Sequence, residues 1–448
     1  MSKTFSIGGI HPHDNKISAN QAIESFPIPA VAYISMAQHL GAPAVPVVQK
    51  GDYVRVGQII GKASGFISAH IHASVSGTVK SVEPFVDVTG KKAMTVVIEV
   101  QGDEWMEEID RTSDIVRTTT FSGPVLTGAE IIQKVAQCGV VGLGGATFPT
   151  HVKLSPPPEK KATCLILNGA ECEPFLTSDY RMMMEQGEEV LIGAQLMMRA
   201  LDVHTCYVGI EDNKPQAIRH LSVLAKAYPG IEVVTLQKKY PQGGEKQLID
   251  AVVKRQVPSR GLPVDVGAVV QNVGTALAVY EAVQKNKPLI EKVITVTGLG
   301  VKAQKNYRVR VGVPLSALVE AVGGVPEGAA KIVLGGPMMG LPVAHIEAPV
   351  VKGSSAILFL SEKEAKRRPE TPCIRCGKCV EACPIGLEPY LLYKLGKVDD
   401  LDGLELNKVY DCIECGCCLY SCPAYVPLLD LIRLYKGRVL GAMRKRGG

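Results

Sequence analysis

The stretch CIRCGKCVEACP at 373–384 decides the fold of the C-terminal part of this chain, and CIECGCCLYSCP repeats its spacing at 412–423. Nine of the 13 cysteines lie between Cys373 and Cys422. The sequence begins MSKTFSIGG, without the apolar segment of an export signal. Crowded thiols in such a chain are typical of metal ligands rather than of disulfides. We therefore predict a C-terminal domain that is organised around bound metal.

The spacing of both runs is C-x2-C-x2-C-x3-C-P, which is the [4Fe–4S] pattern of two-cluster ferredoxins. In that pattern the fourth cysteine of each run is a ligand of the other cluster. Zinc is the alternative metal, but paired C-x2-C thiolates would satisfy it, and zinc explains neither the third cysteine nor the Cys-Pro ending. Cys417 falls out of register and is not expected to be a ligand. The predicted ligand sets are Cys373, Cys376, Cys379 and Cys422 for one cluster, and Cys412, Cys415, Cys418 and Cys383 for the other.

The composition of the 448 residues favours several globular domains. Hydrophobic residues make up 46% of the chain, which also has 45 glycines. The net charge of +5 does not indicate a nucleic-acid partner. No segment approaches the roughly 18 apolar residues of a membrane span, so we expect a chain without a transmembrane segment of its own.

The N-terminal third is predicted to be an extended arm at 1–30 followed by an all-β domain at 31–101. The segments VPVVQKGDYVRVGQIIGKA and IHASVSGTVKSVE alternate apolar and polar residues around glycine turns. KGDYVRVGQ and SGTV resemble the small sandwich of lipoyl and biotinyl carrier domains. The neighbours of Lys62 match neither carrier motif, which favours a structural module without a swinging arm.

Strands alternate with helices between 125 and 290, which predicts a parallel α/β sheet. Buried strands are expected at ATCLILNGA, HTCYVGIED and IEVVTL, and helices at TGAEIIQKVAQCG, EEVLIGAQLMMRAL and KPQAIRHLSVLAKAY. Residues 291–360 combine β-type segments with one helix, LSALVEAVGG, and predict a compact α+β module. SEKEAKRRPE is a charged linker to the cysteine-rich domain at 365–448.

Two polar loops of the α/β part are candidates for ligand binding. In GVVGLGGATFPTHVKL, the glycines Gly142, Gly144 and Gly145 leave backbone N–H groups free to face a phosphate or a flat ring. It is not the dinucleotide fingerprint, because a helix precedes it and Thr147 stands at the third glycine position, and a structural turn is an alternative. NGAECEPFLTSDYR follows a buried strand and should lie at the carboxyl edge of the sheet, where α/β sheets bind ligands, although a solvated loop is again an alternative.

Four motifs together resemble the flavin- and NADH-binding loops of the NADH-oxidising subunit of respiratory complex I. They are G-x-GGA-x-FPT-x-x-K, N-x-x-E-x-EP, Y-x-x-G-x-E-x-x-L-I and N-V-x-T. With the N-terminal GGIHP and the two cysteine runs, nearly the whole chain resembles the RnfC family, the C subunits of the Rnf ion-translocating ferredoxin:NAD oxidoreductases. The resemblance also implies that 291–360 is a β-grasp ligand-binding module.

The resemblance implies two sets of binding residues. NAD(H) is expected near Phe148, Glu171 and Glu173. Three positions depart from the complex I pattern: Ala170 replaces an Asp, Gly244 a Glu and Gln271 an Asn. Those departures place the affinity or the geometry of the flavin in question. The implied FMN ligands are Gly142, Gly144, Gly145, Lys153, Asn168, Gly243, Glu245 and Asn272.

The sequence hypothesis is therefore an enzyme subunit that exchanges hydride between NAD(H) and FMN and passes single electrons through two clusters. Because the cofactors supply the chemistry, no catalytic acid is expected. The implied partners are the membrane subunits, a ferredoxin-type subunit and ferredoxin, at the cytoplasmic face of the inner membrane. One alternative is a soluble reductase resembling cobalamin reductases or the electron-transfer protein of proline reductase. Another is a non-catalytic iron–sulfur subunit without flavin.

Overall fold

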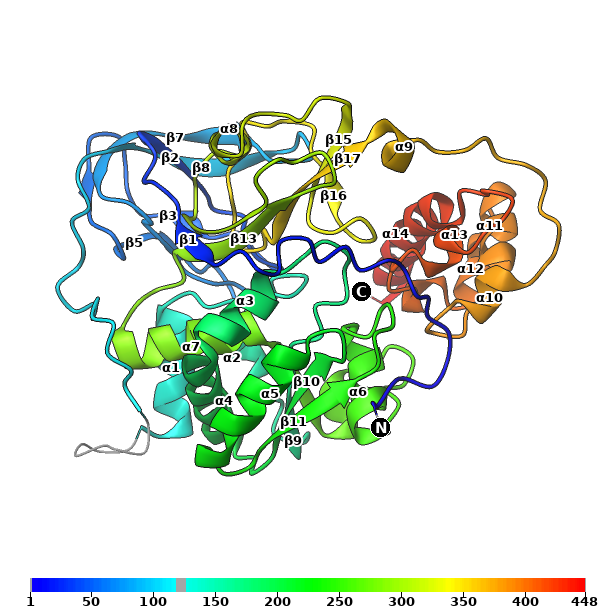
Figure 1. Ribbon diagram of the computed structural model, residues 1–448, viewed down its shortest axis with the longest axis horizontal. Coiled ribbons are helices and arrows are strands. Elements are labelled where there is room, and N and C mark those ends of the chain that lie inside the picture. The colour runs from blue at the N-terminus through cyan, green and yellow to red at the C-terminus, as the bar shows by residue number, and fades with distance from the viewer. Residues whose placement is uncertain (1, 118–125, 448) are drawn as a thin grey trace.

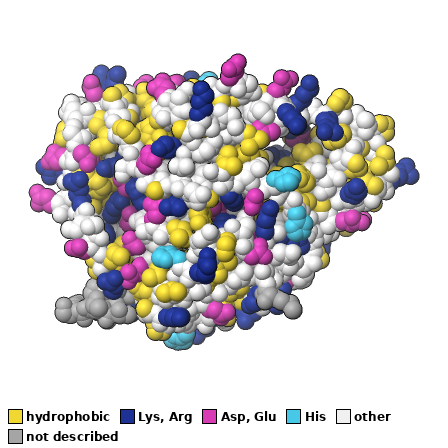
Figure 2. All heavy atoms as spheres, viewed as in Figure 1, with side chains coloured by type: hydrophobic (Ala, Val, Ile, Leu, Met, Phe, Trp, Pro, Cys, Tyr) yellow, Lys and Arg dark blue, Asp and Glu magenta, His cyan; other side chains and the backbone are white. Residues whose placement is uncertain are grey.

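The computed structural model describes residues 2–117 and 126–447, in four consecutive parts (Figure 1). The expected domain boundary at 125 lies outside the described residues, as do residues 1 and 448. In Figure 1 the α/β part, in green, lies below the β-rich parts in blue and yellow, and the cysteine-rich helices, in orange and red, lie to the right. On the face in Figure 2, basic and acidic side chains are interspersed.

The N-terminal domain is a sandwich of two sheets, with strand orders β2-β8-β7-β4 and β3-β5-β6. Apolar residues alternate along its strands, as expected: Ala32 and Ile34 of β2 and Val96 and Ile98 of β8 are fully buried. The strands are β2 (Val31–Ser35), β3 (Val45–Pro46), β4 (Tyr53–Val54), β5 (Ile59–Lys62), β6 (Ile71–His72), β7 (Gly77–Val86) and β8 (Lys92–Val100).

The N-terminal arm is extended, but it also contributes a strand that the sequence analysis did not predict. β1 (Ile23–Ser25) pairs in parallel with β14 (Lys305–Arg310) of the third domain. Earlier in the arm, Ile10 bridges to Tyr240 of the α/β part. Three residues hold too little periodicity to predict a strand, and the partner strand is remote in sequence.

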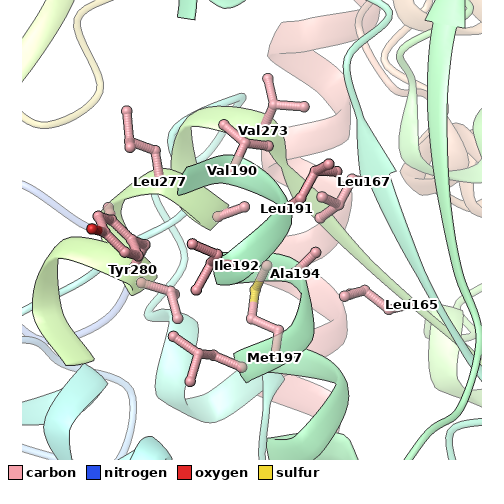
Figure 3. Close-up of a cluster of buried hydrophobic side chains, with 14 of the residues drawn as sticks. Leu165, Leu167, Val190, Leu191, Ile192, Ala194, Met197, Val273, Leu277 and Tyr280 are labelled. Carbon is pink, nitrogen blue, oxygen red and sulfur yellow. The ribbon is translucent and has the colours of Figure 1, made fainter. Parts of the chain in front are cut away.

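The α/β domain is built on a parallel sheet with the strand order β11-β10-β9-β12. Helices α4 and α7 cover one face, where Val190 and Leu191 pack with Val273 and Leu277 (Figure 3). Helix α6 covers the other face with Leu248. The strands are β9 (Cys164–Asn168), β10 (Cys206–Glu211), β11 (Ile231–Leu236) and β12 (Ala268–Asn272). The helices are α1 (Gly128–Gln137), α2 (Thr150–Lys153), α3 (Ser178–Glu185), α4 (Gly187–Leu201), α5 (Pro215–Leu224), α6 (Glu245–Val253) and α7 (Val273–Lys285).

The third domain is a mixed sheet with the order β1-β14-β13-β17-β15-β16, packed against one helix. Its core is aliphatic and includes Ile294, Val309 and Leu318, all fully buried. Its further elements are β13 (Glu291–Thr297), α8 (Leu315–Ala321), β15 (Ala329–Leu334), β16 (Leu341–Pro342), β17 (Ala356–Ser361) and the short α9 (Glu362–Ala365).

The C-terminal domain is helical, and its cysteine runs each lead into a short helix. Gly377 and Gly416 have φ of 78° and 81° and begin these two helices, where a left-handed backbone favours glycine. No helix in the described parts of the chain is long and apolar enough to cross a membrane. The helices are α10 (Lys378–Glu381), α11 (Pro389–Lys397), α12 (Leu401–Leu406), α13 (Cys417–Tyr420) and α14 (Leu428–Gly447).

Candidate functional site

The segment between α1 and α2 contains Gly142, Gly144 and Gly145, and we call it the glycine loop. It opens toward free space. Gly142 N donates to Phe148 O at 2.9 Å and closes the loop at its base. Gly144 and Gly145 are exposed, and their amide N–H groups form no hydrogen bond within the described part of the chain. No heavy atom lies within 4 Å of the place where a Cβ on Gly145 would stand. Free N–H groups on an open backbone fit a phosphate or the polar edge of a flavin.

The carboxyl edge of the sheet brings several expected FMN ligands together. Asn168 and Asn272 end the adjacent strands β9 and β12 and are in register. Asn168 Nδ2 donates to Gly243 O at 2.8 Å, and Asn272 Nδ2 lies 3.4 Å from Asn168 O. Gly144 fits against Asn272 so closely that a Cβ would lie 2.8 Å from Asn272 Nδ2. Asn272 Nδ2 also donates at 2.7 Å to Oδ2 of Asp179, which lies in the loop NGAECEPFLTSDYR but was not predicted as a site residue.

Lys153 and Glu245 form an ion pair at the same edge. Lys153 Nζ lies 2.6 Å from Glu245 Oε1 and donates to Val270 O at 3.1 Å. Glu245 begins α6, where the helix dipole favours a carboxylate. Both side chains are about one-third exposed, so the ammonium is reachable by a ligand.

Glu171 and Glu173 do not lie in a solvated loop. Glu171 is buried and accepts from the N-terminal turn of α3, with Oε1 2.7 Å from Asp179 N. Glu173 accepts from Met338 N at 3.0 Å and from Met339 N at 2.8 Å. Burial raises the pKa of Glu173 to about 7 although these two N–H groups oppose the change. A nucleotide contact at these carboxylates stays a prediction, because the structure gives them protein partners.

Lys16 of the N-terminal arm fixes this acidic loop. Its Nζ donates to the carbonyl oxygens of Glu171 at 2.7 Å, Glu173 at 3.0 Å and Leu176 at 2.6 Å. The N-terminal GGIHP contributed to the family resemblance, but the sequence gave Lys16 no role. Because three backbone carbonyls of the loop bind the same ammonium group, the loop at 171–176 is held in one conformation.

The three departures from the complex I pattern lie around the flavin residues. Ala170 is fully buried, and its O accepts from Lys214 Nζ at 2.7 Å. Gly244 packs against Gln247, where a Cβ would lie 2.5 Å from Oε1. Gln271 is 3% exposed and its Nε2 has no partner within the described part of the chain. An unpartnered buried amide and an open glycine loop fit a bound polar group, so the departures do not make the site unsuitable for FMN.

One cavity in the C-terminal domain contains a complete predicted ligand set. Its lining includes Cys383, Cys412, Cys415 and Cys418. Cys417 also lines it, but the thiol faces Tyr240 O at 3.9 Å. Four cysteines around one cavity match the number and type of ligands of a [4Fe–4S] cluster. We call this the inner site.

The other predicted ligand set lies at the surface. Cys373 and Cys376 are exposed, while Cys379 and Cys422 are half-buried. We call this the outer site. Arg375 and Lys378, beside these cysteines, are exposed as well.

The inner site is joined to the flavin residues by a single segment, 240–247, which is a loop that continues into the first turn of α6; we call it loop 240–247. Tyr240 Oη donates to Cys415 O at 2.9 Å, and Gln247 Nε2 donates to Pro384 O at 3.0 Å. The same loop includes Gly243 and Glu245. The motif Y-x-x-G-x-E-x-x-L-I contains Tyr240, but Gln247 occupies one of its unspecified positions, so no sequence signal indicated its contact.

Four family models match consecutive parts of the chain in the order of the domains. They are the RnfC barrel sandwich hybrid domain at 3–103, the Nuo51 FMN-binding domain at 135–281, the SLBB domain at 293–342 and the 4Fe-4S dicluster domain at 365–423. The chain therefore has an FMN-binding domain and a domain for two [4Fe–4S] clusters.

Curated relatives match the chain over most of its length. The C subunit of the proton-translocating ferredoxin:NAD(+) oxidoreductase complex of Clostridium ljungdahlii is 47% identical over 403 residues, covering 89% of this chain and 86% of the relative. The C subunit of the Na(+)-translocating ferredoxin:NAD(+) oxidoreductase complex of Acetobacterium woodii is 43% identical and covers 98% of both chains. The C subunit of the ion-translocating oxidoreductase complex of Rhodobacter capsulatus is 42% identical and covers 98% of this chain and 84% of the relative.

A solved structure shares the fold at low identity. A chain of an NAD+-reducing [NiFe]-hydrogenase superposes with a TM-score of 0.50 and 20% identity, over 72% of this chain and 64% of that chain. Such a match concerns the fold alone. Because relatives match it over most of its length and the four family models match it in order, the chain belongs to the RnfC family, the C subunits of the Rnf ion-translocating ferredoxin:NAD(+) oxidoreductase complexes.

Proposed function

We propose that the chain moves electrons between NAD(H) and a ferredoxin-type partner along one route, from FMN to the inner cluster and then to the outer cluster. The observation that supports this order is loop 240–247. It contains the expected flavin ligands Gly243 and Glu245 and contacts both cysteine runs through Tyr240 and Gln247. Electron transfer is shared with the Rnf family, and the order of the clusters is specific to this geometry.

The flavin site would use the free amides of the glycine loop, the two asparagines that end β9 and β12, and the Lys153 ammonium. FMN, when bound, supplies the exchange between two-electron hydride transfer and single-electron steps. The chain's own residues bind and orient it. NAD(H) would lie near Phe148 and the loop of Glu171 and Glu173, and no side chain is needed as a catalytic acid.

The exposed outer site is the exit to a partner. Exposed cysteines beside Arg375 and Lys378 suit a partner that presents acidic side chains around its own cluster. We propose that this partner is a ferredoxin-type subunit or ferredoxin. The other Rnf subunits would hold the chain peripherally at the cytoplasmic face of the membrane.

The domains expected from the sequence complete the proposal. The boundaries are an arm at 1–30, a lipoyl-like sandwich at 31–101, the FMN and NAD(H) domain at 125–290, a β-grasp module at 291–360 and the two-cluster domain at 365–448. A soluble reductase of the same composition is the competing function, and a chain that takes up no flavin would favour a non-catalytic iron–sulfur subunit.

An anaerobic titration tests the route. The chain is reconstituted with both clusters and FMN and reduced with NADH, while visible spectra and EPR are recorded. We expect flavin bleaching followed by signals from two reduced clusters. Cys376→Ala should leave NADH reduction of the remaining inner cluster intact, whereas Cys415→Ala should block reduction of the outer cluster. Outer-cluster reduction in Cys415→Ala at the normal rate would contradict the proposed order.

A further inference from the structure

The loop between β15 and β16, residues 335–340, reaches from the third domain to the inner site. The sequence of this loop is GGPMMG. Figure 1 shows it extending toward the helices of the C-terminal domain. Met338 is half-buried, and its Cε and O lie 3.5 and 3.6 Å from the place where a Cβ on Gly416 would stand. Met338 also packs against the apolar cluster that includes Cys415 and Cys417. Because Gly416 and both cysteines line the inner cavity, the methionine lies directly outside its wall.

Glu173 holds this loop in place. Its two carboxylate oxygens accept from consecutive backbone N–H groups, those of Met338 and Met339, at 3.0 and 2.8 Å. Gly336 packs against the Glu173 side chain so closely that a Cβ on residue 336 would lie 2.2 Å from Glu173 Oε2. Any larger residue at 336 would therefore force the two segments apart. Because each carboxylate oxygen accepts from a different backbone N–H, the two bonds fix both the position and the orientation of the loop.

The two adjacent methionines differ in what they contact. The Met338 side chain faces the inner site, whereas Met339 is 46% exposed. Both donate a backbone N–H to Glu173, so truncating either side chain leaves the carboxylate with its partners. Met339 is therefore a matched control for Met338.

We propose that Met338 is an apolar cover over the inner cluster site and that Glu173 is the positioning residue that holds it there. The cover would keep water from the cluster and thereby set its reduction potential, which depends on solvent exposure. Reduction adds negative charge to a cluster with four thiolate ligands, and water stabilises that charge. Loss of the cover therefore raises the potential of the inner cluster and leaves the outer cluster unchanged. The inference rests on the ligand sets of the proposed function.

The assignment also connects two functions of the acidic loop. Glu173 belongs to the loop that is expected beside NAD(H), and Lys16 fixes the backbone of the same loop. A nucleotide that moves this loop would move the cover with it. The third domain thus contributes directly to electron transfer rather than only to the shape of the protein.

EPR-monitored redox titrations of the full chain with both clusters reconstituted test the cover. The variants are Met338→Ala, Met338→Leu, Met339→Ala and Glu173→Gln. We expect Met338→Ala to change the reduction equilibrium of one cluster at least tenfold, which is about 59 mV for a one-electron couple. Glu173→Gln should shift the same cluster in the same direction, because its amide replaces one acceptor oxygen with a donor. Met338→Leu should restore a value near that of the wild type, since leucine is also apolar and large.

The controls separate this inference from the proposed function. If the wild-type chain binds fewer than two clusters, the predicted ligand sets, and with them the proposed function, are wrong. Two clusters with unchanged midpoints in Met338→Ala would overturn the cover alone, as would equal shifts in Met338→Ala and Met339→Ala. A shift of both clusters together would also overturn it, because the contacts of Met338 are with the wall of the inner site, at Cys415, Gly416 and Cys417.

Discussion

Gly8 provides a sharp test of how the N-terminal arm supports the inner site. Its φ is +66°, and a Cβ there would lie 2.4 Å from both the carbonyl carbon and the oxygen of Cys383 and 2.7 Å from Pro384 N. The next residue, Gly9, donates its N–H to Ala382 O at 3.0 Å. Because Cys383 is a predicted inner ligand, Gly8→Ala must displace the cysteine run or the arm.

The size of the effect follows from two contributions. A left-handed non-glycine residue costs roughly 1–2 kcal/mol. The methyl group would also be more than about 1 Å closer to backbone atoms than the roughly 3.5–4.0 Å optimum of two carbon atoms. Overpacking of this kind costs about 1–3 kcal/mol. Gly324→Ala is the matched control, because Gly324 has φ of +85° and no heavy atom within 4 Å of its Cβ position. Gly324→Ala should therefore lose only the free energy that the left-handed backbone costs, and none from overpacking.

The assay measures iron release from the reconstituted chain to a chelator, together with thermal unfolding. We expect Gly8→Ala to release the iron of one cluster about tenfold faster than the wild type, since about 1.4 kcal/mol corresponds to a factor of ten. Gly324→Ala should lower the unfolding temperature slightly and release iron at the wild-type rate. Equal iron release from the two variants would refute the reasoning, because backbone strain alone would then explain the loss.

Three further predictions concern other parts of the chain. Cys376→Ala should lose about one cluster's iron and Cys417→Ala none, and equal iron loss in the two variants would contradict the ligand sets. Lys352 is 1% exposed, its Nζ donates to two backbone carbonyls at 3.0 and 2.7 Å, and burial lowers its pKa from 10.5 to about 7. Above pH 7 the unfolded chain therefore binds more protons than the folded chain, so this lysine makes the protein more stable as pH rises, by about 2–3 kcal/mol from pH 7 to 9. Lys352→Met should remove that rise in chemical denaturation, and an unchanged pH profile would contradict the assignment. Asn272→Ala should weaken FMN binding about tenfold, as measured by flavin fluorescence, because it removes the side chain that Gly144 of the glycine loop packs against. It should also cost about 1 kcal/mol of stability, since Asn272 Oδ1 accepts from Gly274 N at 2.8 Å and caps α7. Undiminished flavin affinity would remove Asn272 from the site.

Several features of the fold were predictable because they are local. Alternating apolar residues predicted the strands of the sandwich, and the segment TGAEIIQKVAQCG was predicted as the helix that is α1, which Thr127 caps by accepting from Glu130 N with its Oγ1. The cysteine spacing predicted two ligand sets, and the structure brings one of them around a single cavity. The loop NGAECEPFLTSDYR was predicted at the carboxyl edge of the sheet, and Asn168 does end β9 there.

The contacts between domains were not predictable in the same way. β1 is a strand because β14 pairs with it, and Glu173 was expected in a nucleotide-binding or solvated loop until the loop at 335–340 supplied its partners. The bonds of Gln247 to Pro384 and of Lys352 to Gly139 join residues more than 100 positions apart. No periodicity or short motif records such pairs.

The sequence by itself determined the chemistry that the chain can hold, because metal-ligand spacing, strand alternation and helix capping depend on residues a few positions apart. Tertiary structure alone decided which cluster site faces the flavin residues and which faces solvent. That choice depends on the packing of the arm, loop 240–247 and the Met338 loop against one cysteine-rich domain. The reason is physical: the order of an electron route is set by distance and exposure in space, and these arise only when remote segments pack together.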